Sequence, residues 1–122
     1  MTSGLPGSPG PVEHLAVYGS LQPDESNFHV VADLQGDWRP GIVRGHLHDR
    51  GWGSEMGFPA IVLDPQGPEV KVMVLTSPDL PSAWPRLDTF EGPGYRRILA
   101  PVTLPDDDAT PITAHIYELH HP

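Results

Sequence analysis

Hydrophobic and polar positions alternate along much of this chain, which is the pattern of half-buried β-strands. In residues 40–49, Val43, Gly45 and Leu47 alternate with Ile42, Arg44 and the histidines. Short apolar runs bounded by turn residues predict further strands at 14–18, 58–64, 68–76, 95–104 and 110–119. In residues 68–76 the valines share one face, and the other face is apolar enough to be partly buried as well.

One segment, residues 77–92, has the pattern of a helix. Leu80, Trp84 and Leu87 lie at positions i, i+4 and i+7, which places them in one apolar stripe. Ser77, followed by a proline, predicts the N-cap. Pro85 lies inside the segment, so we expect two short helical pieces, the second opening near this proline.

The remaining segments define the domain. Residues 1–12 are built of Gly, Pro and Ser without periodicity, which predicts a flexible tail, and residues 13–122 then form a single domain. Residues 24–34 predict a short helix or a loop that covers one end of the core. The class is therefore α+β and mostly β. About six strands with few helices favour an antiparallel sheet that is either open or closed as a barrel, and the pattern does not decide between them.

Composition adds tight turns and narrows the chemistry. The 122 residues include 16 prolines and 13 glycines, which suits short strands joined by tight turns. The chain has no cysteine, which excludes disulfides, thiolate metal sites and cysteine nucleophiles and fits a reducing compartment.

Charge and hydropathy exclude two classes of partner. Seven basic residues against 16 acidic ones give a net charge of −9, which disfavours nucleic acid. No apolar run approaches the ~20 residues of a membrane helix, and no secretory signal pattern is present. We expect a cytoplasmic protein that associates with neither nucleic acid nor membrane.

The most informative polar residues are Asp88 and Glu91, which are three positions apart and share a helix face. They are either a solvated acidic patch or a functional pair. Negative charge near a helix C-terminus opposes the helix dipole by about 0.3–1 kcal/mol, so the placement is locally unfavourable. Between Phe90 and Tyr95, Glu91 is suited to a pocket that raises its pKa, as a general acid/base near neutral pH requires.

Two other kinds of site have weaker support. His46 and His48 project to one strand face, and residues 41–55 are similar to the His-x-His half of a cupin metal site. However, Glu55 follows His48 by more positions than that pattern allows, and no second half follows Val70. Solvent-facing strand histidines are the simpler interpretation, and we expect no metal. Ser20 lacks the sequence surroundings of a nucleophilic serine.

Four segments, in order, resemble the γ-glutamylcyclotransferase-like family, which includes the plant AIG2-like and γ-glutamylamine cyclotransferase branches. They are VYGSL at 17–21, VRGHLHD at 43–49, GFPAIVL at 57–63 and LDTFEGPGYRR at 87–97, and together they cover most of residues 14–119. The resemblance implies a small mixed-sheet β-barrel with a few peripheral helices and a pocket between the first and last of these segments.

The resemblance also implies a reaction. The α-amine of a γ-glutamyl amine or amino acid attacks its own γ-carbonyl and gives 5-oxoproline and a free amine, without a cofactor. Glu91 would be the catalytic acid/base. The substrate-binding residues would be Tyr18, Gly19, Ser20, Leu21 and Tyr95, with backbone N–H groups of the Gly19–Ser20 turn holding an anionic group. A non-catalytic small-molecule-binding protein on the same scaffold is the main alternative, and a cupin-like metal enzyme is a minor one.

Overall fold

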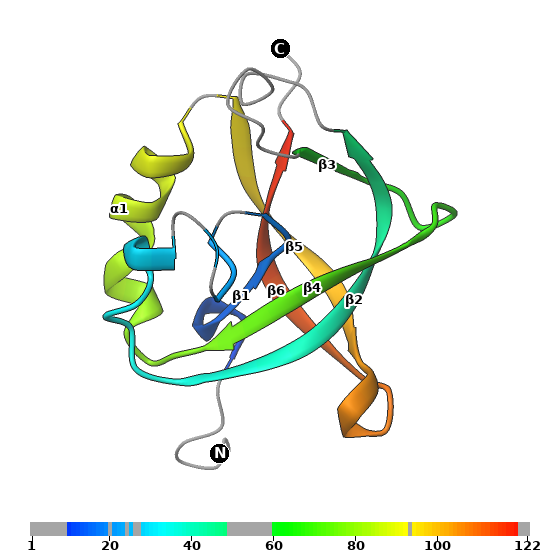
Figure 1. The fold of residues 1–122 in the computed structure, drawn as a ribbon, viewed down its shortest axis with the longest axis horizontal. Helices are drawn as coiled ribbons and strands as arrows, with labels where there is room; N and C mark the ends of the chain where they lie inside the picture. The colour runs from blue at the N-terminus through cyan, green and yellow to red at the C-terminus, as the bar shows by residue number, and fades with distance from the viewer. Residues whose placement is uncertain are drawn as a thin grey trace.

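The computed structural model describes residues 10–19, 21–23, 25, 28–48, 60–92 and 94–119. Its strands are β1 (His14–Val17), β2 (Asp37–His48), β3 (Ala60–Leu63), β4 (Glu69–Thr76), β5 (Tyr95–Leu104) and β6 (Thr110–Leu119). Within these residues the helices are α1 (Leu80–Glu91) and the short 3-10 helices η1 (Pro11–Glu13), η2 (Phe28–Val30) and η4 (Pro105–Asp107). Figure 1 shows the strands wrapped into a barrel, with α1 and η2 beside it.

The strands close into a ring. β1, β4, β2, β3 and β6 pair in that order, and β1 then pairs with β6 to complete a five-strand barrel. β5 runs along β6 over its whole length and pairs with β2 at one position, Ile42 opposite Thr103. The β1–β6 and β3–β6 pairs are parallel and the other pairs are antiparallel. The chain therefore forms the mixed-sheet barrel that the resemblance predicted, and the closure gives β1 a partner on both sides, β4 and β6.

The barrel interior is filled by alternate residues of the strands, as the period of two predicted. Val70, Val72 and Val74 of β4 point inward, opposite Ile116 of β6 and Val102 of β5. All five side chains are buried.

A second core joins the outer side of the barrel to α1. Leu80, Trp84 and Leu87 are buried, so the predicted helical stripe is confirmed. They pack with Leu15 of β1 and Leu75 of β4, both fully buried and pointing away from the barrel interior. These two strands therefore contact apolar side chains on both faces.

The start of α1 differs from the prediction. The N-cap is Asp79 rather than Ser77, and the helix begins at Leu80. Ser77 is fully buried, its hydroxyl accepts a hydrogen bond from the Asp79 amide (3.1 Å), and its carbonyl accepts one from the Leu80 amide (3.3 Å). Because the chain makes one turn at residues 78–79 before the helix, Ser77 organises this turn instead of capping the helix.

Pro85 does not divide the helix, contrary to the expectation of two pieces. α1 runs without interruption from Leu80 to Glu91 with this proline inside it. A proline removes one backbone hydrogen bond. The apolar stripe on either side of Pro85 is buried against the barrel, and this packing keeps the helix continuous.

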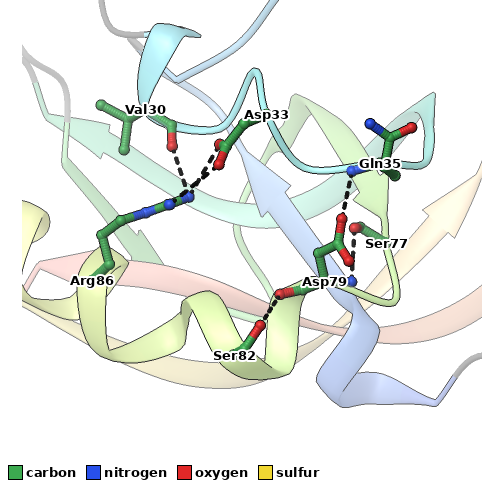
Figure 2. Close-up of polar contacts among 7 residues, drawn as sticks. All are labelled: Val30, Asp33, Gln35, Ser77, Asp79, Ser82 and Arg86. Atoms are coloured by element: carbon green, nitrogen blue, oxygen red, sulfur yellow. Dashed lines mark hydrogen bonds and ion pairs between the residues drawn. The ribbon is translucent and has the colours of Figure 1, made fainter.

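Residues 28–35 cover the barrel beside α1. Phe28–Val30 form the 3-10 helix η2, and Val31 is buried. Figure 2 shows how this segment is tied to the helix: Arg86 donates to the Val30 carbonyl (3.1 Å) and forms an ion pair with Asp33 (3.3 Å). At the helix start, the Gln35 amide donates to the Asp79 carboxylate (2.9 Å). These contacts hold α1 in place at its start, through Asp79, and at its middle, through Arg86.

The predicted tail falls only partly within the described residues. Residues 1–9 lie outside them, and Pro11–Glu13 form η1. The Trp84 indole donates to the Val12 carbonyl (3.1 Å), which ties η1 to the helix. In the described part of the chain, no helix has the length and apolar character needed to span a membrane.

Candidate active site

Glu91 is the last residue of α1. The helix ends there because Gly92 adopts a φ of 80°, a left-handed value that favours glycine, and its amide donates to the Asp88 carbonyl (3.0 Å). The backbone position of Glu91 is therefore fixed at the end of the helix.

The Glu91 carboxylate is desolvated and lies near two tyrosines. The residue is half-buried, and no hydrogen bond or ion pair joins its carboxylate to another described residue. Burial raises the pKa of Glu91 to about 7. Burial also raises the pKa of Tyr18 and of Tyr95, and in both cases the nearby Glu91 charge adds to the shift. The structure thus brings Tyr18, Tyr95 and Glu91 into one electrostatic neighbourhood.

Asp88, one helical turn earlier, is in the opposite situation. Its carboxylate accepts two hydrogen bonds from Arg97, at 2.8 and 3.2 Å, and a third from the Tyr117 hydroxyl at 2.6 Å. The hydrogen bonds from Arg97 hold the pKa of Asp88 below its ordinary value. Of the two acidic residues in the helix, Asp88 therefore has its negative charge stabilised by its partners, and Glu91 is suited to exchange a proton near neutral pH.

The Tyr18 hydroxyl is occupied by the fold. It donates to the Tyr117 carbonyl (2.6 Å) and accepts from the Ile61 amide (3.2 Å), so it links the end of β1 to β6 and β3. Its ring packs against the barrel-interior cluster. Tyr18 consequently has a fixed orientation, and its ring is the part left for contact with a ligand.

The predicted loop of residues 18–21 is described except for Ser20, which lies outside the described residues. The Gly19 carbonyl accepts hydrogen bonds from the backbone and side chain of Gln22, at 3.1 and 3.2 Å. The amides of Gly19 and Leu21 donate no hydrogen bond to another residue that the structure describes. The Leu21 side chain is buried in the helix-side core, so only its backbone is available to a ligand.

Two polar residues near this end of the barrel were not singled out from the sequence. Glu118 is only 5% exposed; one oxygen accepts from Arg96 at 3.0 and 3.1 Å and the other from the Leu63 amide at 2.9 Å. The Glu118 charge contributes to the raised pKa of Tyr18, so it lies near the same aromatic ring. Tyr117 is the other, through its bonds to Tyr18 and Asp88. The only signal that could have identified Tyr117 and Glu118 was their place in a strand that lies beside the LDTFEG segment. Which strand lies there depends on how the strands pair.

The histidines considered for a metal are on the surface. His46 bonds to Asp64 (2.9 Å), and His48 is exposed. Among the described residues, no three His, Asp or Glu side chains gather as metal ligands would. Glu55, the other residue of that hypothesis, lies outside the described part of the chain.

Comparisons with known proteins identify the family of this chain. The family model described as γ-glutamyl cyclotransferase, AIG2-like, matches residues 15–122. A search of curated protein sequences finds no significant match.

Solved structures share the fold. An AIG2-like protein from Mus musculus superposes with a TM-score of 0.72 at 20% identity, covering 90% of this chain and 80% of its own. An uncharacterised protein from Pyrococcus horikoshii gives a TM-score of 0.61 at 19% identity, with 89% and 79% covered. A structure described as γ-glutamyl cyclotransferase gives 0.63 at 20% identity, with 88% and 66% covered. On the match of the family model, this chain belongs to the AIG2-like γ-glutamyl cyclotransferase family.

Proposed function

We propose that this protein converts a γ-glutamyl amine or γ-glutamyl amino acid to 5-oxoproline and a free amine, with Glu91 as the general acid/base. The observation that carries the proposal is the half-buried Glu91 carboxylate. It has a pKa of about 7, has no partner among the described residues and lies beside two tyrosine rings. Family membership supports the same reaction class. We also propose the cytoplasm as its compartment. The chain has no cysteine and therefore no disulfide that a reducing compartment would break.

The reaction needs one proton acceptor that later becomes a donor. The substrate's α-ammonium first releases a proton to solvent, and the neutral amine attacks the γ-carbonyl carbon. As the new N–C bond forms, Glu91 accepts the second amine proton. The tetrahedral intermediate then collapses, the bond to the leaving nitrogen breaks, and Glu91 returns its proton to that nitrogen. A carboxyl group with a pKa near neutral pH is present in both forms, so both transfers are accessible.

Cyclisation also benefits from confinement. Both reacting groups belong to one molecule, so a site that holds the bent conformer removes much of the entropic barrier. In the proposal, the rings of Tyr18 and Tyr95 form the walls of this site. The amides of the residue 19–21 loop hold an anionic oxygen, either the developing oxyanion or the substrate's α-carboxylate. Support for this role comes from the Gly19 and Leu21 amides, which donate to no other described residue.

The test is an assay of 5-oxoproline with a panel of γ-glutamyl amino acids and γ-glutamyl amines, comparing wild type with Glu91→Gln. The substitution keeps the shape and removes the exchangeable proton. We expect wild type to be active and Glu91→Gln to lose about 100-fold or more in kcat. Glu25→Gln is the matched control, because it makes the same chemical change at an exposed glutamate, and we expect it to keep the activity of wild type.

Two outcomes would contradict the proposal. Product formation that survives Glu91→Gln would remove the acid/base role of this residue. A folded wild-type protein that binds γ-glutamyl compounds in calorimetry, yet forms no 5-oxoproline from any of them, would instead support the non-catalytic binding protein.

A further inference from the structure

Tyr117 of β6 bonds to both elements that carry the candidate site. Its backbone carbonyl accepts the Tyr18 hydroxyl (2.6 Å) at the end of β1. Its side-chain hydroxyl donates to Asp88 (2.6 Å) in the last turn of α1. Tyr117 is 5% exposed, so it contributes a buried group to both bonds. A single residue therefore connects the start of the residue 18–21 loop to the end of the helix.

The bond to Asp88 is part of a larger attachment of the helix end. Arg97 of β5 forms a bidentate pair with the same carboxylate, and its guanidinium stacks on the Trp84 ring at 4.4 Å. Asp88 is 44% exposed and Arg97 24% exposed, so this ion pair is accessible to solvent and to salt. The Tyr117 hydroxyl is the buried partner of Asp88, and its hydrogen bond is a short, charge-assisted one.

Glu91 depends on this attachment for its position. Its own carboxylate bonds to no other described residue, so its location follows from the backbone of the last helical turn. That turn includes Asp88, whose carbonyl accepts the Gly92 amide and whose side chain is bonded to β5 and β6. The start and the middle of the helix are held by other contacts, through Asp79 and Arg86 (Figure 2).

We propose that the Tyr117 hydroxyl is a positioning group that holds Glu91 in its half-buried place against the Tyr18 end of β1. The claim about placement stands on the hydrogen bonds alone, and the claim about turnover rests on the proposed function. The groups near Glu91 on the packed elements are Tyr18, which directly follows β1, Tyr95 of β5 and Tyr117 of β6, with Asp88 on its own helix.

The test uses Tyr117→Phe, which keeps the ring and removes the hydroxyl. The first readout needs no activity: the pKa of Glu91, followed by NMR of the ¹³C-labelled glutamate carboxyl groups and assigned with Glu91→Gln. We expect the pKa of Glu91 to fall from about 7 toward its ordinary 4.5, because a loosened helix end admits water to the carboxylate. The second readout is 5-oxoproline formation, where we expect kcat to fall about 10- to 100-fold with little change in KM.

Thr89→Val is the matched control. It removes a hydroxyl from the same part of α1, but that hydroxyl bonds only within the helix, to the Pro85 carbonyl (3.0 Å), among the described residues. We expect both readouts to match wild type. Where Tyr117→Phe does not fold, Asp88→Glu serves instead: it keeps the negative charge near Glu91 and displaces the carboxylate from Tyr117, and we expect changes in the same direction.

The outcomes separate the two proposals. A Glu91 pKa that is the same in Tyr117→Phe as in wild type overturns the positioning role, whatever the activity. A pKa that falls in Tyr117→Phe supports the positioning role even where wild type forms no 5-oxoproline, and that lack of product contradicts the proposed function alone.

Discussion

Asp88 and Glu91 lie one helical turn apart on α1 and have opposite electrostatic surroundings. Asp88 accepts three hydrogen bonds from Arg97 and Tyr117, whereas the Glu91 carboxylate bonds to no other described residue and is desolvated. The pKa of Asp88 is lowered and that of Glu91 is raised to about 7. Two carboxylates driven apart in this way have separate tasks: one attaches the helix end, and the other is able to exchange protons.

The first prediction concerns the pH dependence of turnover. Glu91 accepts a proton only when ionised, so kcat/KM should rise with pH through a pKa of about 7 in the free enzyme. Steady-state rates of 5-oxoproline formation between about pH 5 and 9 measure this limb. A limb near the ordinary glutamate value of 4.5 would show that the residue is not desolvated in solution.

The second prediction concerns stability. The folded chain keeps a proton on Glu91 up to about pH 7, whereas the unfolded chain releases it near 4.5, so the folded state binds more protons between these values. This contribution to stability is fully present below about pH 4.5 and is lost as pH rises through about 7. Glu91→Gln removes the loss, and we expect its free energy of unfolding to exceed that of wild type at about pH 8 by about 1–3 kcal/mol more than at about pH 4.5.

Urea unfolding at the two pH values measures this difference, with Glu25→Gln as the control. Glu25 is an exposed glutamate, so its replacement should change the free energy of unfolding equally at both pH values. An advantage of Glu91→Gln that is the same at low and high pH would contradict a buried ionisable group.

The third prediction concerns the residue that ends the helix. An added Cβ at Gly92 would meet no atom within 4 Å, so Gly92→Ala tests the backbone alone. Its φ of 80° and ψ of −176° are unfavourable for alanine, and we expect a loss of about 1–3 kcal/mol in the free energy of unfolding. Gly10 also has open space around a Cβ but no left-handed φ, so Gly10→Ala should change stability by less than about 0.5 kcal/mol. Equal effects at the two sites, measured by chemical denaturation, would contradict the strained conformation.

The fourth prediction uses the two prolines of α1. Pro85 lies inside the helix and leaves the Pro81 carbonyl without an intrahelical donor, so Pro85→Ala should raise the free energy of unfolding by about 1–3 kcal/mol. Pro81 lies in the first turn, where the amide has no intrahelical acceptor. Pro81→Ala should therefore give no gain and a loss of about 0.4–1 kcal/mol, from the greater freedom of the unfolded chain. Thermal unfolding of the two variants compares them directly. A higher stability for Pro81→Ala than for wild type would contradict the placement of Pro81 in the first turn of the helix.

Local patterns predicted the elements well. β5 and β6 occupy the residues that their apolar runs indicated, and the stripe of Leu80, Trp84 and Leu87 is buried as its spacing required. These features depend on neighbours a few positions apart, which a single sequence displays directly. The N-cap of α1 was misplaced by two residues, at Ser77 instead of Asp79, because the serine–proline pair at 77–78 suits either an N-cap or the turn that precedes one.

The parts of the site that were missed depend on which strands meet. Nothing in the residues around Tyr117 or Glu118 shows that the first meets Tyr18 and Asp88, or that the second meets Arg96 and the Leu63 amide. These contacts follow from the β5–β6 register and from barrel closure, and periodicity reports the face of a strand but not its partner. Glu91 could be singled out from the sequence because the unfavourable place of a carboxylate at a helix end is a local property.

The pairing of β1 with β6 has a consequence for how the chain folds during its synthesis. The bond from Tyr18 to Tyr117 joins positions that are 99 residues apart, and the parallel pairing beside it spans the same distance. At a synthesis rate of about 5–20 residues per second, β1 is complete roughly 5–20 seconds before β6 exists. During that interval one edge of β1 has no partner, and an unpaired edge is a template for strands of other chains. The end of the barrel where Tyr18 meets Tyr117 is therefore assembled last. Slow or stalled translation is then the condition under which this fold is most exposed to aggregation.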